Sequence, residues 1–356
     1  EQLADMPIQT EYAKSYVSFV PLGPILAIMP WNFPFWQVFR FAVPNIAAGN
    51  TAILKHSRNT MGCAIEIENI FRRSGLFEGV FVNLVIGSNR VPKIIEDNRI
   101  KAVTLTGSTP VGREVAKISG FNLKKNVLEL GGSDPYIILN DAPLEKTVKT
   151  CVQARLINNG QSCIAAKRFI VEKGVFSDFI DLFISEMQNK TIGDPLDSHT
   201  DIGPLARGDL RLDLHSQVTR SLSEGAELLL GGTIPKRTGY FYPATVITKV
   251  NPGMAVFDEE TFGPVAAIIE AKDEKDAIEL ANRSPFGLGA ALFTADIEKG
   301  DYIAKNQLQA GCCFINDFVK SDPRLPFGGI KDSGYGRELS IFGIREFVNI
   351  KTVCVK

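Results

Sequence analysis

The sequence predicts an α/β fold built around parallel strands. Short apolar runs rich in β-branched residues alternate with longer segments of helical periodicity along most of the 356 residues, which is typical of parallel strands joined by crossover helices. Several of these runs end in a polar or glycine-containing turn, where parallel sheets commonly bind ligands. The composition, 45% hydrophobic and 22% charged, is that of an ordinary globular protein, and the length allows two domains.

An apolar face and a following glycine define the helix expected at 61–74. The face comprises Met61, Ala64, Ile65, Ile67, Ile70 and Phe71, and Gly75 comes next. Further helices are expected at 112–118, 143–157, 175–189 and 273–282. The expected strands are 25–29, 51–54, 80–85, 102–106, 127–130, 136–139, 168–171, 244–248, 265–270, 288–293 and 312–315.

Two interruptions of this pattern bear on the domain organisation. The run GGSDP at 131–135 is the break most like a domain boundary. Residues 14–20 (KSYVSFV) alternate in polarity and precede PLGP at 21–24. They predict an edge strand outside the main sheet, suited to a subunit contact.

Charge and cysteine usage exclude several functional classes. The net charge of -1 gives no electrostatic reason to expect nucleic acid or an anionic membrane as partner. No apolar run reaches the length of a membrane helix, and residues 1–15 lack a signal-peptide pattern. The six cysteines form no CxxC pair and no zinc spacing, so we expect reduced thiols, a cytoplasmic protein and no metal site.

One cysteine lies in a polar turn between an expected helix and an expected strand. The stretch RLINNGQSCIAAKRF at 155–169 contains Cys163. Two interpretations stay open: a small buried hydrophobe, or a nucleophile activated by exposure and nearby backbone dipoles. None of the three histidines (56, 199 and 215) is close to it in sequence. If Cys163 is catalytic, we expect its base to be a carboxylate.

Two further motifs place a polar group beside a buried strand. In PWNFPFW at 30–36, two prolines fix the backbone around Asn32, whose amide could stabilise an oxyanion; a rigid aromatic turn is the alternative. In LELGGSDP, Glu129 lies inside an apolar strand. Burial should raise its pKa toward the range of a general base, unless it belongs to a structural salt bridge.

Other patterns suit a phosphate-containing ligand. Strand 102–106 leads into GSTPVG at 107–112 and then a helix, a turn that can present N–H groups to phosphate or be a plain tight connection. Lys55 directly follows the expected strand 51–54. There it can either reach ligand hydroxyls or remain solvated. Two further motifs stand out. The segment EETFGP at 259–264 places Glu260 next to a turn, and PFGGIKDSGYGRE at 326–338 is a glycine-rich loop.

Together these motifs resemble those of the NAD(P)-dependent aldehyde dehydrogenases, from about residue 14 to the C-terminus. PWNFP, the lysine after the next strand, TGSTxxG, ELGG, GQxC, EExFGP and PFGGxKxSGxGRE occur in the family's order. Within the family, stretches such as LGPILAIMPWNFPFWQVFR and LPFGGIKDSGYGREL look like the bacterial succinate-semialdehyde dehydrogenases. The resemblance also implies that the family's first helices and strands are missing from this chain.

The resemblance implies roles for the reacting groups. Cys163 would attack the aldehyde carbon, and the Asn32 amide with the Cys163 backbone N–H would bind the oxyanion. After hydride transfer, Glu129 would activate the water that hydrolyses the thioester. Ile164 and Ala165 follow the cysteine, so no neighbouring thiol can form a redox switch with it.

The resemblance also implies the binding of NAD or NADP. Lys55 and Glu260 would hold the ribose hydroxyls, and Ser108 would face the pyrophosphate. Arg58 stands where many NAD-specific relatives have a glutamate, so NADP should be accepted. The full expected set is Ile28, Met29, Trp31, Lys55, Ser57, Arg58, Gly107, Ser108, Val111, Leu130, Glu260 and Phe262.

The same resemblance suggests how a semialdehyde carboxylate would be bound. Arg40 lies eight residues after Asn32 on the helix that PWNFP opens, about two turns away. Ser321 would assist, whereas the second arginine of some relatives is Ile157 here. The alternative for Arg40 is a structural ion pair at the domain interface.

The implied architecture is a parallel-sheet cofactor domain, an α/β catalytic domain and a small oligomerisation element. We expect residues 22–131 to bind cofactor, 132–331 to carry the nucleophile, and 332–345 to form a return helix. Residues 1–21 with 346–356 should build a homodimer or homotetramer. The expected activity is oxidation of a small aldehyde, most simply succinate semialdehyde. The rivals are another small aldehyde or a non-catalytic protein derived from the family.

Overall fold

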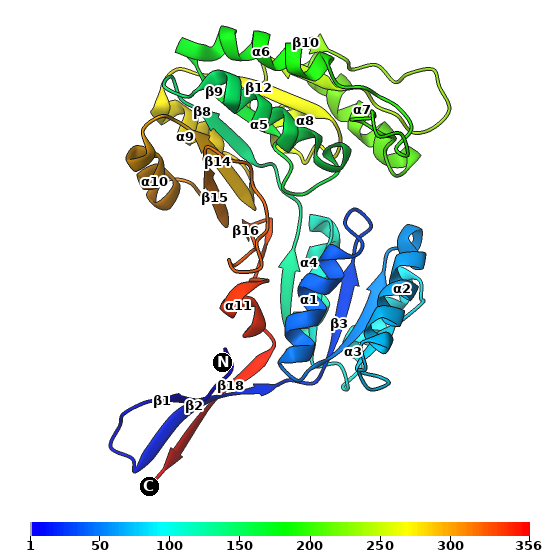
Figure 1. The fold of residues 1–356 in the computed structure, drawn as a ribbon, viewed down its shortest axis with the longest axis vertical. Coiled ribbons are helices and arrows are strands. Elements are labelled where there is room, and N and C mark those ends of the chain that lie inside the picture. Colours follow the sequence, from blue (N-terminus) through cyan, green and yellow to red (C-terminus); the bar gives the residue numbers. More distant parts are fainter. Residues whose placement is uncertain (1) are drawn as a thin grey trace. The chain divides into compact units, whose positions relative to one another are not determined.

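A computed structural model describes residues 2–356 as two compact units, each with its own sheet (Figure 1). The first unit contains the chain up to Leu130 together with Ser321–Gly329 and Ser333–Lys356. The second contains Gly131–Lys320 and Ile330–Asp332. The break after Leu130 falls at the expected GGSDP boundary. Residues 321–329 pack with the first unit rather than with 132–320, because Phe327 exchanges two backbone hydrogen bonds with Glu338.

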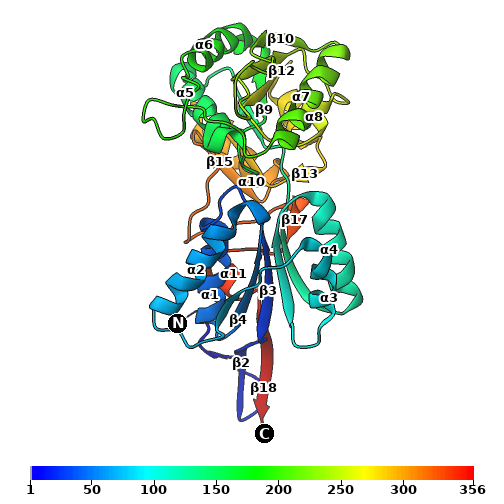
Figure 2. The same ribbon diagram turned by 90° about the vertical axis from the view of Figure 1, so that its right-hand side faces the viewer.

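The first unit has a six-stranded sheet in the order β17-β7-β6-β3-β4-β5, parallel except for β17 (Figure 2). Side chains of the central strand alternate between two cores: Ile25 and Ala27 pack with helices α1 and α2, and Leu26 packs with α3 and α4. Burial on both faces explains the continuous apolar run. The elements are β3 (Pro24–Met29), α1 (Trp36–Ala47), β4 (Thr51–His56), α2 (Met61–Arg73), β5 (Phe81–Asn83), α3 (Val91–Glu96), β6 (Ala102–Thr106), α4 (Thr109–Phe121), β7 (Lys125–Glu129), β17 (Gly334–Tyr335) and α11 (Ser340–Ile344).

The second unit has a seven-stranded sheet in the order β10-β11-β12-β9-β8-β14-β15, in which only the pair β10–β11 is antiparallel. A two-stranded sheet joins β13 (Phe286–Gly287) to β16 (Ile330–Lys331). The strands are β8 (Pro135–Ile138), β9 (Arg168–Glu172), β10 (Glu227–Leu230), β11 (Thr245–Thr248), β12 (Val265–Ala271), β14 (Gly289–Phe293) and β15 (Cys312–Ile315). The helices are α5 (Leu144–Leu156), α6 (Phe176–Gln188), α7 (Gly208–Ser223), α8 (Ala255–Asp258), α9 (Glu274–Asn282) and α10 (Ile297–Asn306).

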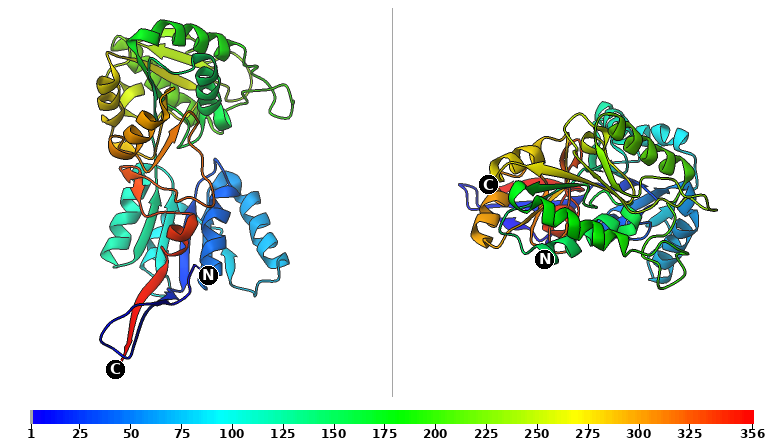
Figure 3. Two further views of the ribbon diagram at one scale, coloured as in Figure 1. Left: turned by 60° about the vertical axis from the view of Figure 1, so that its left-hand side comes forward. Right: turned by 90° about the horizontal axis from the view of Figure 1, so that it is seen from above.

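A small sheet at the ends of the chain contains β1 (Met6–Pro7), β2 (Lys14–Pro21) and β18 (Val348–Val355), in the order β1-β2-β18 (Figure 3). The strand expected at 14–20 does lie outside the main sheet. The expectation that it is an edge strand is wrong, because β18 pairs with all of β2 on one side and β1 pairs with Tyr16 and Val17 on the other.

The structure contains all eleven expected strands, with ends shifted by a few residues. Helix α2 ends as expected: Gly75 has φ +86° and its N–H donates to the Arg72 carbonyl. Ile65 was expected on the buried face but is 50% exposed, because the core side of α2 is the narrower stripe of Ala64, Ile67 and Phe71. Helices α3, α7, α8 and α10 were not predicted; the sequence of α7 is mostly polar. The return helix expected at 332–345 is wrong in extent, because the segment contains β17 and only the short helix α11. No helix in residues 2–356 is long and apolar enough to cross a membrane.

Candidate active site

Cys163 is half-buried in a rigid turn of the second unit. Helix α5 ends at Leu156, and Asn158, Asn159 and Gly160 then adopt left-handed backbone conformations with φ of 48°, 57° and 76°. A Cβ on Gly160 would lie 2.2 Å from the Gly263 carbonyl oxygen, so only glycine fits there. The turn therefore holds the thiol between α5 and β9 in a conformation that few sequences adopt.

The amides in this turn bind the loop at 203–206. The Asn159 Oδ1 accepts from the Gly203 N–H at 2.9 Å, and its Nδ2 donates to the Pro204 carbonyl at 3.3 Å. The Gln161 Oε1 accepts from the Ala206 N–H at 2.9 Å. These polar residues explain the composition of the stretch before the cysteine: they anchor its backbone.

Two buried cations also bind carbonyls of this turn. Arg155 donates to the Gly160 carbonyl at 2.8 Å and to the Val265 carbonyl at 3.2 Å, and burial lowers its pKa to about 9. Lys167 donates to three carbonyls, including that of Cys163 at 2.7 Å. Burial also lowers the pKa of Lys167.

Glu260 packs against the GG pair that follows β7. Its Oε1 accepts from the Gly132 N–H at 3.1 Å and lies 4.0 Å from the Lys167 ammonium. Burial raises the pKa of this carboxyl, and Lys167 opposes the shift. A Cβ on Gly131 would lie 2.6 Å from the Glu260 Oε2. The absence of a side chain at Gly131 therefore allows the Glu260 carboxylate to approach the backbone closely. Phe262 follows in the loop before β12 and is half-buried.

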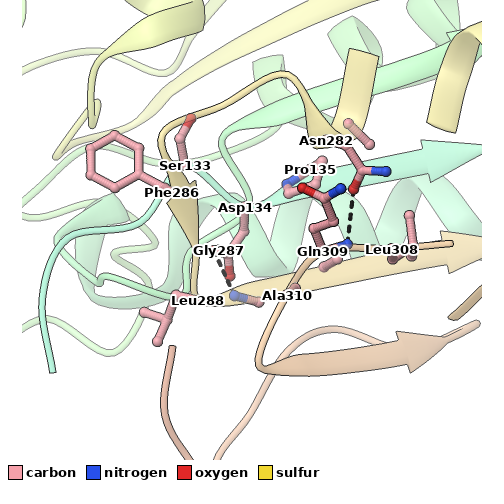
Figure 4. Close-up of a pocket in the computed structure, with 13 residues that line it drawn as sticks. Ser133, Asp134, Pro135, Asn282, Phe286, Gly287, Leu288, Leu308, Gln309 and Ala310 are labelled. Atoms are coloured by element: carbon pink, nitrogen blue, oxygen red, sulfur yellow. Dashed lines mark hydrogen bonds between the residues drawn. The ribbon is translucent and has the colours of Figure 1, made fainter. Parts of the chain in front are cut away.

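A second buried carboxyl, Asp134, lies in the same unit. It lines a small hollow with Ser133, Phe286 and Gln309 (Figure 4). Its Oδ1 accepts from the Gly289 N–H at 3.0 Å. Burial raises its pKa to about 6, and Lys167 opposes the shift.

In the first unit, Asn32 lies in the loop between β3 and α1. The Gln37 Nε2 donates to the Asn32 Oδ1 at 3.2 Å, which turns the Asn32 amide nitrogen away from Gln37. His56 supports the same loop. Its Nε2 lies 3.0 Å from the Pro34 carbonyl oxygen, and its Nδ1 lies 2.9 Å from the Ser57 backbone nitrogen and 3.2 Å from the Met29 carbonyl oxygen. Burial lowers the pKa of this imidazole and favours the neutral form.

Glu129 ends β7 and is 2% exposed. Within the described chain, neither of its carboxylate oxygens has a hydrogen-bond partner. Burial raises its pKa well above the ordinary value, and Glu338 adds to the rise while Arg40 opposes it. A Cβ on Gly328 would lie 2.7 Å from Glu129 Oε1, so the glycine-rich segment at 326–338 makes room for the carboxyl. The raised pKa agrees with the sequence-based expectation.

Arg40 and Ser321, the expected substrate-binding pair, both contact polar groups of the first unit. Arg40 is buried, forms an ion pair with Glu338, and lies 4.6 Å from the Phe327 ring centroid. The Ser321 hydroxyl accepts from the Trp36 Nε1 at 3.0 Å. Arg40 also lines an apolar hollow with Trp36 and other residues of α1. The expected alternative of an ion pair is thus present, but inside the first unit.

The expected cofactor residues of the first unit cluster at one sheet edge. They follow the carboxyl ends of adjacent parallel strands, where α/β sheets bind nucleotides. Lys55 is buried and its pKa is lowered by that burial, whereas Arg58 is exposed. A Cβ on Gly112 would lie 2.4 Å from the Leu130 side chain, so this glycine allows α4 to pack closely on the sheet. The cluster contains Ile28, Met29, Trp31, Lys55, Ser57, Arg58, Gly107, Ser108, Val111 and Leu130.

Comparison with known proteins agrees with this arrangement. The model of the aldehyde dehydrogenase family matches residues 1–353. The chain is 48% identical to a probable succinate-semialdehyde dehydrogenase [NADP(+)] of Synechocystis sp., covering 100% of this chain and 78% of that protein. The chain belongs to the aldehyde dehydrogenase family.

Further proteins similar to this aldehyde dehydrogenase have the same kind of name. The succinate semialdehyde dehydrogenase [NAD(P)+] Sad of Escherichia coli is 51% identical, over 98% of this chain and 75% of its own. The crystal structure of the Streptococcus pyogenes succinic semialdehyde dehydrogenase with NADP+ superposes with a TM-score of 0.97 at 38% identity, over 99% of this chain and 78% of that one. The chain is an NAD(P)-dependent oxidoreductase that acts on an aldehyde.

Sequence reasoning missed several residues that support the site of this aldehyde dehydrogenase. Lys167 was not singled out in the sequence. His56 was considered only as a distant partner for Cys163, although it binds the Asn32 loop. Arg155 was given no role in the turn, which it supports by donating to the Gly160 carbonyl. The available signal was a positive charge next to apolar residues: Arg155 stands between Ala154 and Leu156, and Lys167 follows Ala165 and Ala166.

Proposed function

We propose that this aldehyde dehydrogenase oxidises succinate semialdehyde to succinate, with Cys163 as nucleophile. The observation that carries the proposal is the half-buried thiol in a turn fixed by buried cations and left-handed residues. The relatives named succinate-semialdehyde dehydrogenase, at 47–51% identity, support the substrate.

In the proposed reaction, the Cys163 thiolate forms a bond to the aldehyde carbon, and the carbonyl oxygen becomes an oxyanion. The Asn32 amide and the Cys163 N–H stabilise that oxyanion. When bound, NAD(P)+ accepts the hydride, and a thioester remains on Cys163. Glu129 removes a proton from the attacking water; the carbon–sulfur bond then breaks, which releases succinate and restores the thiolate.

The cofactor residues are proposed on the geometry of the first sheet. The turn of Gly107 and Ser108 opens the 13-residue helix α4, whose N-terminal N–H groups suit a pyrophosphate. Lys55 lies on a neighbouring strand end and suits ribose hydroxyls, as does Glu260 in the second unit. We propose that the first unit binds cofactor and that the second presents the nucleophile.

Cofactor preference should depend on Arg58. This exposed guanidinium can pair with a 2′-phosphate, so Arg58→Glu should lower the ratio of kcat/KM for NADP+ over NAD+ by about tenfold or more, the effect of one lost charge-assisted contact. Steady-state kinetics with both cofactors measures the ratio. The matched control is Lys93→Glu, a charge reversal at an exposed position of α3. A ratio that is equally unchanged in both variants would show Arg58 to be a bystander.

Recognition of the substrate carboxylate should depend on Arg40. A guanidinium has five N–H donors, so Arg40 can bind Glu338 and still serve a second carboxylate. Losing a partly buried charge-assisted contact of about 1.5–3 kcal/mol should raise KM for succinate semialdehyde by about tenfold or more. Butanal, which lacks the carboxylate, should be nearly unaffected.

The variant must not leave Glu338 as an unpaired buried charge. We therefore expect the double variant Arg40→Met/Glu338→Gln to show the selective loss, with Glu338→Gln alone as its control. Equal losses for butanal and succinate semialdehyde would make Arg40 a structural residue and favour another small aldehyde as substrate.

We further propose a reduced, cytoplasmic homo-oligomer that associates through the β1-β2-β18 sheet. Ile350 and Val355 on β18 and Ile8 after β1 are exposed apolar side chains, and none of the six cysteines forms a disulfide within residues 2–356. Sedimentation of wild type and of Ile350→Lys tests this: a monomeric wild type would contradict it.

A further inference from the structure

The Lys167 side chain lies completely buried beneath the Cys163 turn. Its ammonium donates to the carbonyls of Ser162 at 2.9 Å, Cys163 at 2.7 Å and Ala165 at 3.1 Å. An ammonium has three N–H donors, and each of them has a carbonyl here. A lysine that serves only to fill space or to bind one distant carboxylate would not bind three carbonyls of the same turn.

These contacts fix the direction of one particular N–H group. The Ser162 carbonyl and the Cys163 N–H belong to the same peptide, and in a trans peptide the two point in opposite directions. The described chain has no cis peptide. Because Lys167 holds the Ser162 carbonyl, the Cys163 N–H must point away from the ammonium. That N–H is the backbone donor of the proposed oxyanion site.

The surroundings hold the cation in place. Glu260 Oε1 lies 4.0 Å from the ammonium, and the buried Asp134 carboxyl also interacts with it. A Cβ on Gly132 would lie 2.7 Å from the Cys163 carbonyl oxygen. The Cys163 carbonyl therefore contacts both the Gly132 backbone and Lys167.

We propose that Lys167 is a positioning residue for the nucleophile: it clamps the turn so that the Cys163 N–H faces the reacting oxygen, and its buried positive charge stabilises the Cys163 thiolate. The inference rests on the proposed role of Cys163. In this role Lys167 contacts neither substrate nor cofactor, but it sets both the geometry and the ionisation of the Cys163 thiol.

Two variants separate geometry from charge. Lys167→Met removes both the donors and the charge, whereas Lys167→Gln keeps two N–H donors without charge. The rate of Cys163 alkylation by iodoacetamide, followed against pH by mass spectrometry of the Cys163 peptide, needs neither aldehyde nor cofactor. Loss of a nearby buried charge should move the midpoint of this profile upward by about one pH unit or more in both variants.

Turnover should distinguish the two variants. Above the shifted midpoint, Lys167→Gln should regain kcat to within about fivefold of wild type, while Lys167→Met should stay at least about tenfold lower, as expected for a misdirected oxyanion donor. The control is Lys249→Met, which removes an exposed lysine paired with Glu227 in the same unit. It should keep the wild-type alkylation profile and kcat.

A folded Lys167→Gln variant with the wild-type alkylation profile would overturn the charge role, and wild-type kcat in a folded Lys167→Met variant would overturn the clamp. If Lys167→Met does not fold, Lys167→Gln tests both points. Because this variant keeps two N–H donors, recovery of kcat above the shifted midpoint would support the clamp, and a kcat that stays low there would contradict it. A shifted profile combined with undiminished turnover in Cys163→Ala would support the role of Lys167 and contradict the proposed nucleophile.

Discussion

Replacing Cys163 with alanine should lower aldehyde oxidation by about 10⁴-fold or more, the usual scale for the loss of a covalent nucleophile. Binding of NADPH should remain within about threefold of wild type, because the proposed cofactor contacts at the end of the first sheet do not involve the thiol. Steady-state absorbance measures the turnover, and quenching of protein fluorescence measures the binding.

The matched control is Cys354→Ala, which removes an exposed thiol from β18. It should leave both quantities unchanged. Turnover at the wild-type rate in Cys163→Ala would exclude the covalent mechanism, whereas equal loss of turnover and cofactor binding would indicate that the turn had collapsed.

Substituting Glu129 with glutamine should slow release of the product acid by about 10²–10⁴-fold, the contribution of a general base, with a smaller effect on formation of the thioester. Rapid mixing with aldehyde and NADP+ should then show a burst of NADPH followed by a slow steady state. A uniform loss of both phases would contradict the role of base.

The same substitution should change stability in a pH-dependent way. The raised pKa means that folded Glu129 keeps its proton at pH values where the unfolded chain, with a pKa near 4.5, has lost it. Its contribution to stability is therefore complete below pH 4.5 and is lost as pH rises toward the raised value. Glutamine carries no such penalty, so Glu129→Gln should be more stable than wild type at pH 8 and should lose this advantage at pH 4.

Urea unfolding at the two pH values measures this difference. The exposed Glu114→Gln on α4 is the control and should show the same stability as wild type at both. A Glu129→Gln variant that gains nothing at pH 8 would mean that the carboxylate is well compensated in the folded protein.

The sequence allowed the sheets to be predicted because their strands are buried on both faces. The run at 102–106 has no exposed residue in the structure, and its β-branched and apolar residues mark it as a strand in the sequence. The exposed face of α2 was harder to place, since Ile65 is apolar but solvated. The central position of β2 could not be inferred, because it depends on pairing with residues more than 300 positions away.

The residues of the candidate site also divide into those that local sequence marks and those that depend on contacts in the folded chain. Glu129 ends β7, and Asn32 and Cys163 lie in polar connections between a strand and a helix, where local sequence marks them. Lys167 and Arg40 act through contacts that no local pattern reveals: one gathers carbonyls from an irregular turn, and the other pairs with Glu338 across almost 300 residues. Identifying them required the folded chain.

The interleaving of the two units imposes an order on biosynthesis. All but three residues of the second unit form one continuous stretch, Gly131–Lys320, whereas the first unit needs Ser333–Lys356 to complete it. The eight-residue ladder between β2 and β18 can form only after the ribosome has made the whole intervening chain. Until then β2 has no partner strand along the side that β18 will occupy, and such an open strand edge can be bound by chaperones or start aggregation.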